Sequence, residues 1–165
     1  MEELRDLYDA NGIKTDKTYR KGDNIPNGYY PMVVMVVIRN TKGEFLMQKR
    51  VKSKVVDWGV TVGHPKSGET PLEGIITEVK EELGLDFSKE NFIEYDSGCD
   101  GNDCYKMYFV CKDIDLENIK IKEEELSEVR WFSMVELKQM VDRNELNENQ
   151  ISCFIKVCKF LREYK

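Results

Sequence analysis

One stretch of the sequence, Met32–Ile38, is continuously apolar and reads Met-Val-Val-Met-Val-Val-Ile. Apolar runs rich in β-branched residues are typical of strands that are buried on both faces. The run is too short to span a bilayer, since a membrane helix needs about 20 residues. The sequence therefore predicts a central strand in a sheet that is covered on both sides.

The rest of the chain supplies more strands and a few helices. Apolar residues at helical spacing predict helices, and short β-branched or aromatic runs between turn residues predict strands. The expected strands are residues 44–50, 58–62, 92–95, 105–111 and 129–132, and the expected helices are residues 70–84, about 133–143 and about 149–164. Such a mostly β chain with one central and two late helices indicates an α+β fold, an α/β/α sandwich around a mixed sheet. These patterns do not determine the strand order.

An extension precedes the apolar strand. Residues 4–30 read as short strands and turns, and Asn11-Gly12 is typical of a hairpin turn. The chain contains no internal repeat and no linker-like stretch. We therefore expect a single domain over residues 1–165, with residues 1–30 as a strand or hairpin extension that could serve a homodimer.

The best-defined helix follows residue 69. Thr70 suits the N-cap, Pro71 suits the first helical position, and Glu73 completes a Thr-x-x-Glu capping box. Gly84 is typical of a helix C-terminus. One face of this helix is therefore expected to pack on the sheet. That face consists of Leu72, Ile75, Ile76, Val79 and Leu83.

Three glutamates crowd together on the same helix. Residues three and four apart are neighbours on a helix, so Glu78 lies beside both Glu81 and Glu82. Each such pair of like charges costs on the order of 0.2–0.5 kcal/mol, and Lys80 is expected to point away from the group. A hard divalent cation such as Mg²⁺ or Mn²⁺ would turn that repulsion into coordination. A solvated acidic face is the alternative interpretation of the helix alone.

The charge balance limits the possible partners. The formal net charge is -6, and no Lys/Arg-rich tract offsets it. Nucleic-acid polymers and anionic membranes would be repelled, whereas a small phosphorylated ligand could bind through a metal ion. The N-terminus is acidic and lacks the apolar segment of a signal peptide, which favours a cytoplasmic protein.

The chain contains five cysteines. An odd number without a paired C-x-x-C framework favours reduced thiols in a cytosolic protein. Cys99 and Cys104 could meet across a hairpin, but ordinary hairpin positions are the favoured interpretation over a redox or metal pair.

Residues 63–85, which read GHPKSGETPLEGIITEVKEELGL, resemble the signature of the Nudix hydrolase family, G-x5-E-x7-R-E-U-x-E-E-x-G-U with U aliphatic. The likeness extends over about residues 33–136 and implies the Nudix-like form of the expected α/β/α sandwich. A pattern of this length at fixed spacing is far more specific than an isolated glycine motif. The matching residues are Gly63, Glu69, Glu78, Val79, Glu81, Glu82, Gly84 and Leu85.

The resemblance implies a metal-dependent hydrolase that cleaves a diphosphate linkage in a nucleoside-diphosphate-like or other small phosphorylated substrate. It assigns metal binding to Glu78, Glu81, Glu82 and the carbonyl group of Gly63. Glu69 corresponds to a position that supports the loop or reaches the metal through water.

The resemblance also indicates residues outside the signature. A further acidic residue, chosen here as Glu125 from the run Glu123–Glu125, would act as base or extra ligand. Lys49 and Arg50, at the end of a strand, could steady a phosphate. Substrate specificity is expected to reside in loops, namely residues 8–30, 51–57 and 97–104.

The sequence departs from the signature at one position. Thr77 stands where the family has an arginine that pairs with the glutamates. Loss of a charge-assisted bond removes on the order of 1.5–3 kcal/mol, and nothing nearby in the sequence obviously replaces the arginine. A catalytically weak Nudix-fold protein that binds a nucleotide or diphosphate is therefore the alternative function.

The tripeptide Gly63-His64-Pro65 is similar to isopentenyl diphosphate isomerase, which shares the fold. That enzyme needs a cysteine where this chain has Val62 and three histidines, whereas His64 is the single histidine here. Isomerase activity is therefore disfavoured, and His64 is interpreted as a loop residue near the pocket rather than a metal ligand.

Overall fold

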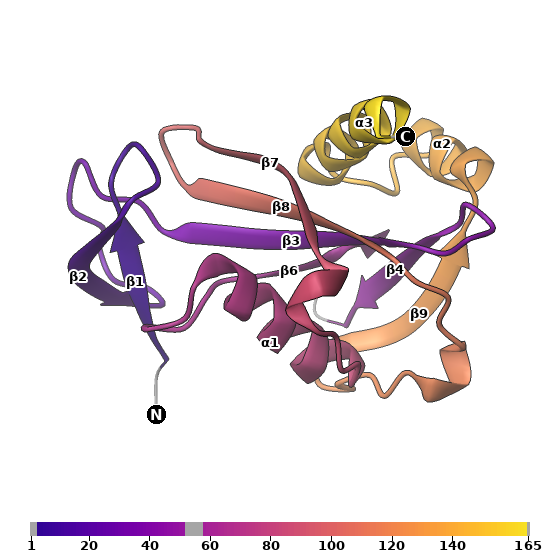
Figure 1. The fold of residues 1–165 in the computed structure, drawn as a ribbon, viewed down its shortest axis with the longest axis horizontal. Helices are drawn as coiled ribbons and strands as arrows, with labels where there is room; N and C mark the ends of the chain where they lie inside the picture. The colour runs from indigo at the N-terminus through magenta and orange to yellow at the C-terminus, as the bar shows by residue number, and fades with distance from the viewer. Residues whose placement is uncertain (1–2, 52–57, 165) are drawn as a thin grey trace.

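The computed structural model describes residues 3–51 and 58–164 (Figure 1). The predicted specificity loop at residues 51–57 therefore lies almost entirely outside the described residues. In chain order the elements are β1 (Leu4–Tyr8), β2 (Lys14–Arg20), β3 (Met32–Arg39), β4 (Phe45–Arg50), β5 (Trp58–Gly59), β6 (Thr61–Gly63), α1 (Pro71–Leu83), the 3₁₀-helix η1 (Lys89–Asn91), β7 (Ile93–Cys99), β8 (Cys104–Cys111), the 3₁₀-helix η2 (Leu116–Asn118), β9 (Leu126–Phe132), α2 (Met134–Asp142) and α3 (Glu148–Glu163).

The apolar strand β3 lies in the middle of the main sheet. It runs parallel to β8, from the pair Met32 and Cys104 to the pair Arg39 and Cys111, and antiparallel to β4 and β6. Within the described residues this sheet has seven strands in the order β5-β4-β3-β8-β7, with β6 also paired to β3 and β9 to β4. The sheet is therefore mixed, as expected.

Helices cover both faces of this sheet (Figure 1). Val34 and Val36 point into a core shared with α1, whereas Met35 and Val37 point into a second core shared with α2 and α3. All four side chains are buried. The α+β class and the α/β/α sandwich are confirmed, because a strand that is apolar at every position has a packing partner on each side. No helix of the described residues has the length and apolar character needed to cross a membrane.

Helix α1 begins and ends where the sequence predicts. The hydroxyl of Thr70 accepts a hydrogen bond from the Glu73 N–H at 3.2 Å, and the Glu73 carboxylate accepts one from the Thr70 N–H at 3.0 Å. Gly84 has a φ of 67°, in the left-handed region that glycine adopts without strain. A second capping box, formed by Ser133 and Glu136, is present at the start of α2.

Several expected boundaries differ from the structure. Strand β7 continues to Cys99 instead of ending at residue 95, and β9 begins at Leu126 instead of residue 129. The expected strand 58–62 is divided into β5 and β6, because the N–H of Val60 donates a hydrogen bond to the Gln150 side chain (3.0 Å). Helix α3 begins at Glu148, one residue earlier than expected. Its N-cap Asn147 accepts a hydrogen bond from the Gln150 N–H.

The N-terminal extension is a hairpin of β1 and β2 that forms its own two-stranded sheet beside the main one (Figure 1). Its attachment centres on Asp6, which is buried. Asp6 accepts hydrogen bonds from the Ser67 hydroxyl (2.7 Å) and the Gly68 N–H (2.9 Å) and pairs with Lys14 (2.9 Å). Burial acts to raise the pKa of Asp6, but these partners hold it below its usual value. The hairpin is thus fixed to the loop that precedes α1.

Cys99 and Cys104 form a disulfide, which corrects the expectation of five reduced cysteines. The register of β7 and β8 pairs these two residues directly across the hairpin, with their Cα atoms 4.0 Å apart. The turn is closed by a hydrogen bond from the Asp100 N–H to the Asp103 carbonyl group (3.1 Å). The sequence did not determine this register, so it did not determine the pairing. The free cysteines are Cys111, Cys153 and Cys158.

Candidate active site

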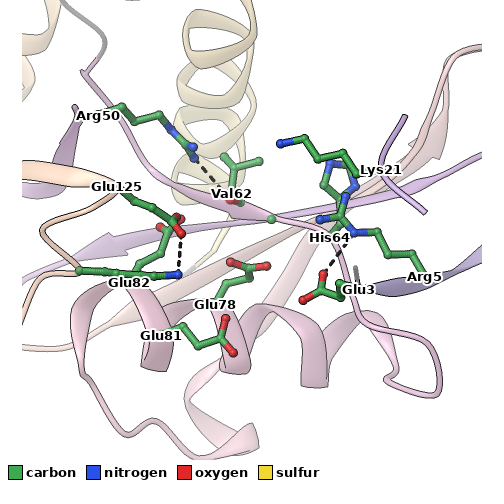
Figure 2. A pocket seen from close by; sticks show the side chains of 12 residues that line it. Glu3, Arg5, Lys21, Arg50, Val62, His64, Glu78, Glu81, Glu82 and Glu125 are labelled. Carbon is green, nitrogen blue, oxygen red and sulfur yellow. Dashed lines mark hydrogen bonds and ion pairs between the residues drawn. The ribbon is translucent and has the colours of Figure 1, made fainter. Parts of the chain in front are cut away.

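A cleft of about 600 Å³ lies where the end of β6, helix α1 and the N-terminal hairpin meet (Figure 2). Carboxylates of α1 line its floor, and basic side chains line both ends. Its lining residues are Glu3, Arg5, Lys21, Arg50, Val62, Gly63, His64, Glu78, Glu81, Glu82, Lys122 and Glu125. Six side chains were predicted to bind metal, act in catalysis or bind phosphate, and all of them except Lys49 line this cavity. Gly63, whose carbonyl group was predicted to bind metal, lines it too.

Glu78 packs against the backbone of Gly63. A Cβ atom at Gly63 would stand 2.1–2.4 Å from atoms of the Glu78 side chain, closer than real contacts allow. Burial raises the pKa of Glu78 to about 7, and the charges of Glu82 and Glu81 add to the rise, although a hydrogen bond from the His64 backbone opposes it. This carboxyl group is therefore desolvated and repelled by its neighbours, a state that a bound cation would relieve.

Glu82 is 3% exposed and is held by two residues of the sheet. The Gln48 side chain donates a hydrogen bond to the Glu82 carboxylate at 2.6 Å, and the Thr61 hydroxyl donates one to the Gln48 side-chain oxygen at 2.9 Å. Burial raises the pKa of Glu82, and the hydrogen bond from Gln48 partly opposes the rise. Gln48 was not among the site residues predicted from the sequence. The one signal for it is its position two residues before Arg50, on the same face of the strand.

Three contacts occupy the region of the missing signature arginine. The Thr77 hydroxyl donates a hydrogen bond to Glu69 at 2.8 Å, and the second Glu69 oxygen accepts one from the Lys66 N–H at 2.8 Å. The Lys66 ammonium group pairs with Glu81. Lys66 thus supplies a positive charge beside the glutamates, which corrects the expectation that nothing nearby replaces the arginine.

Of the three residues predicted outside the signature, two line the cleft and one does not. Glu125 lines the cleft and pairs with Lys122 at 2.6 Å. Arg50 is exposed and also lines the cleft. Lys49 points to the opposite face of β4, where its ammonium group lies 5.9 Å from the centre of the Trp58 ring. Alternation along the strand explains why Arg50 and Lys49 face different sides.

The N-terminal hairpin region contributes charged groups to the cleft. Lys21 lies within the specificity loop expected at residues 8–30, whereas Glu3 and Arg5 lie outside every segment that the sequence assigned to the site. Arg5 and Lys21 line one end of the cleft, and Arg5 pairs with Glu3 at 3.2 Å (Figure 2). His64 lies beside them, as a loop residue at the pocket. Its Nδ1 is 3.0 Å from the Met32 carbonyl oxygen, which can only accept, so Nδ1 carries the proton. Burial, followed by the charge of Arg5, lowers the pKa of His64.

The oxygen atoms that line the cleft suit a divalent metal ion, both in their chemical type and in their closeness to one another. Three carboxylates and a backbone carbonyl are the oxygen ligands that Mg²⁺ and Mn²⁺ prefer, and the glycine at position 63 leaves room for Glu78. In the described part of the chain, no three acidic, His or Cys side chains already converge on one metal position. Glu81 is turned to Lys66, and Glu82 to Gln48. Metal binding therefore requires rotation of these side chains.

Comparison with known proteins identifies the family of the chain. Residues 29–152 match the NUDIX domain family. An uncharacterized Nudix hydrolase of Listeria innocua is 32% identical over 154 residues, which cover 88% of each chain, and one of Listeria monocytogenes matches to the same extent. The chain therefore belongs to the Nudix family.

Solved structures share the fold. DR0079 from Deinococcus radiodurans superimposes with a TM-score of 0.73 at 18% identity, over 99% of this chain and 100% of that one. The Nudix domain of Shewanella oneidensis NrtR, complexed with ADP ribose, gives 0.64 at 13% identity over 80% and 88%. A Caenorhabditis elegans Ap4A hydrolase gives 0.58 at 19% identity over 81% and 99%. At these identities the likeness concerns the fold alone.

Proposed function

We propose that this protein is a hydrolase that uses Mg²⁺ or Mn²⁺ to cleave a diphosphate linkage in a small phosphorylated substrate. The observation that carries the proposal is the carboxylate row Glu78, Glu81 and Glu82 on one cleft floor, with Glu78 packed against Gly63. Membership of the Nudix family and the hydrolase names of the relatives support it. A nucleoside diphosphate or a similar compound is the expected substrate, in a single-domain cytoplasmic protein.

The proposed reaction is the transfer of a phosphoryl group to water. The water oxygen forms a bond to one phosphorus, the bridging P–O bond breaks, and the water proton passes to a carboxylate. When bound, the metal supplies positive charge that neutralises the diphosphate and lowers the pKa of the water. Glu125 lines the cleft, and its partly exposed carboxylate can release Lys122 and accept a proton from the attacking water. It is therefore the proposed base.

The other residues hold the reacting groups in place. Gln48 orients Glu82 through its 2.6 Å hydrogen bond. Arg50 stands at one end of the cleft, where it donates a hydrogen bond to the Val62 carbonyl group at 3.5 Å and has no ion pair among the described residues. It is the proposed contact to the diphosphate. Lys49 lies on the opposite face and is given no role in the reaction.

The proposal is tested by measuring phosphate or phosphomonoester release from a panel of nucleoside, sugar and isoprenoid diphosphates. We expect turnover of one class with Mg²⁺ or Mn²⁺, and loss of turnover when the metal is chelated. Folded protein that binds metal but turns over no member of the panel would contradict the hydrolase assignment.

A diphosphate-binding protein with weak catalysis is the second candidate, and Thr77 favours it. Thr77 contacts Glu69 but carries no charge, and Lys66 reaches Glu81 instead. The substitution Thr77→Arg separates the candidates. A hydrolase that is weakened at this position should gain turnover, whereas a binding protein should gain almost none.

A further inference from the structure

The two ends of the cleft differ in what they present to a ligand. Arg50 stands at one end, Arg5 and Lys21 stand at the other, and the glutamates of α1 lie between them (Figure 2). A diphosphate bound over these glutamates would therefore extend toward a cation at each end. The surroundings of each cation indicate what is attached to the diphosphate on that side.

At the hairpin end, Lys21 carries a positive charge that no described neighbour pairs with. Arg5 is already paired with Glu3 at 3.2 Å. Lys21 is exposed, and among the described residues its ammonium group has no ion pair, hydrogen bond or aromatic partner. An ammonium group that faces a cleft without a partner suits a doubly charged phosphate group, which brings oxygen acceptors and negative charge together.

The position of Lys21 is fixed relative to α1 by the attachment of the hairpin. Asp6 on β1 accepts hydrogen bonds from Ser67 and Gly68 in the loop that precedes α1, and the Ser67 N–H also donates to the Leu4 carbonyl group at 2.7 Å. The backbone that carries Lys21 is therefore connected to the helix that carries the glutamates, so one ligand can contact both.

The Arg50 end opens toward a second space whose walls carry both polar and apolar side chains. A second cavity of about 340 Å³ shares Arg50 and Val62 with the cleft. Met35 and Met107 are among its apolar walls, and Tyr105 adds an aromatic ring. The volume falls within the roughly 300–1,000 Å³ of pockets that bind organic ligands. The apolar and aromatic walls can contact a ring, and the polar residues Asp103, Asn149 and Lys156 can bond to its polar groups.

The hairpin end offers no such wall. Among the described residues that line the cleft, Val62 is the one apolar side chain, and it lies toward Arg50. The hairpin end is lined by Glu3, Arg5, Lys21 and His64. A second organic group attached to the far side of the diphosphate would find charged side chains there and no apolar surface.

We propose that the substrate has a free terminal phosphate, which Lys21 binds with Arg5 beside it, and an organic group that enters the second cavity past Arg50. This inference rests on the proposed function and deepens it. It selects organic diphosphates and triphosphates over diphosphates that carry an organic group at both ends.

The test compares matched pairs that share a nucleoside: ADP with ADP-ribose, UDP with UDP-glucose, and CDP with CDP-choline. For at least one nucleoside, we expect kcat/KM to be about tenfold or more higher for the member with the free phosphate. Lys21→Ala should lower kcat/KM for that member about tenfold, the effect of one charge-assisted contact, and should change the value for the capped member less than about twofold. Lys21→Arg should retain most of the activity.

Lys17→Ala is the matched control, because Lys17 lies on the same hairpin but stacks over Tyr29 outside the cleft. It should leave both values unchanged. Equal or faster turnover of the capped members, or an equal effect of Lys21→Ala on both members, would overturn the inference while leaving the hydrolase intact. If no compound is turned over, the proposed function fails. The affinities of the same pairs are then measured by calorimetry with Mg²⁺. Tighter binding of the member with the free phosphate, lost in Lys21→Ala, would support the inference, and equal binding of both members would overturn it.

Discussion

At the scale of single residues, the cleft depends on one position that has no side chain. Gly63 allows the Glu78 carboxyl group to lie against the backbone, where any Cβ would stand 2.1–2.4 Å from it. The φ of Gly63 is not in the left-handed region, so the requirement is space rather than backbone conformation. The signature glycine is therefore explained by the approach of Glu78, a contact between residues that are 15 positions apart in the chain.

Gly63→Ala is predicted to displace Glu78 and to weaken metal binding. We expect a loss of about tenfold or more in the affinity for Mn²⁺, measured by calorimetry, because one charged ligand moves. In the double variant Gly63→Ala with Glu78→Gln, the alanine should cause little further loss, since both changes act on the same ligand. Additive losses would mean that Gly63 acts through some other group.

At the scale of secondary structure, α1 was predictable and the attachments around it were not. The helix has its caps, Thr70 and Gly84, within its own sequence, so a local pattern determines where it begins and ends. Gln48 reaches Glu82 across 34 positions of the chain, and Asp6 reaches Ser67 across 61. Such contacts depend on how strands and the hairpin are arranged in space, which the residue patterns of each element do not contain.

Asp6→Asn is predicted to loosen the hairpin. The change removes the charge that pairs with Lys14 and that strengthens the hydrogen bonds from Ser67 and Gly68. We expect the free energy of unfolding, measured by denaturant titration, to fall by roughly 1–3 kcal/mol. Asp16→Asn, at an exposed position of the same hairpin, should be nearly neutral. Equal stability of both variants would contradict the role of Asp6.

The disulfide between β7 and β8 predicts the number of reactive thiols. Alkylation of the denatured, unreduced protein should modify three cysteines, namely Cys111, Cys153 and Cys158, and reduction should raise the number to five. Mass spectrometry measures both numbers. Five modified cysteines without reduction would restore the expectation that all the thiols are free.

At the scale of the whole molecule, negative charge is concentrated where a cation is proposed to bind. Glu78 has a pKa of about 7 in the folded protein, against an ordinary value of 4.5. Its folded form therefore binds a proton more tightly than its unfolded form. The contribution of Glu78 to stability is full below pH 4.5 and is lost as the pH rises through 7, with a size on the order of 3 kcal/mol. The lowered pKa of His64 acts in the opposite direction.

Without bound metal, the protein is therefore predicted to lose stability as the pH rises, because Glu78 becomes charged. Relative to Glu78→Gln, the wild-type Tm should fall between pH 5.5 and pH 8, and the comparison removes the contribution of His64. Mg²⁺ should raise the wild-type Tm more at pH 8 than at pH 5.5, because the metal binds the deprotonated carboxylate. Calorimetric scans at the two pH values measure both effects. An equal Mg²⁺ effect at both would contradict a site built on Glu78.

The most direct test of a hydrolase that works through the carboxylates of α1 is the turnover of the double variant Glu81→Gln with Glu82→Gln. It is measured beside the wild type at saturating Mg²⁺, with circular dichroism as a check on folding. We predict a folded protein whose turnover has fallen at least about a hundredfold. Unchanged turnover in the folded double variant would contradict the metal assignment and the mechanism built on it.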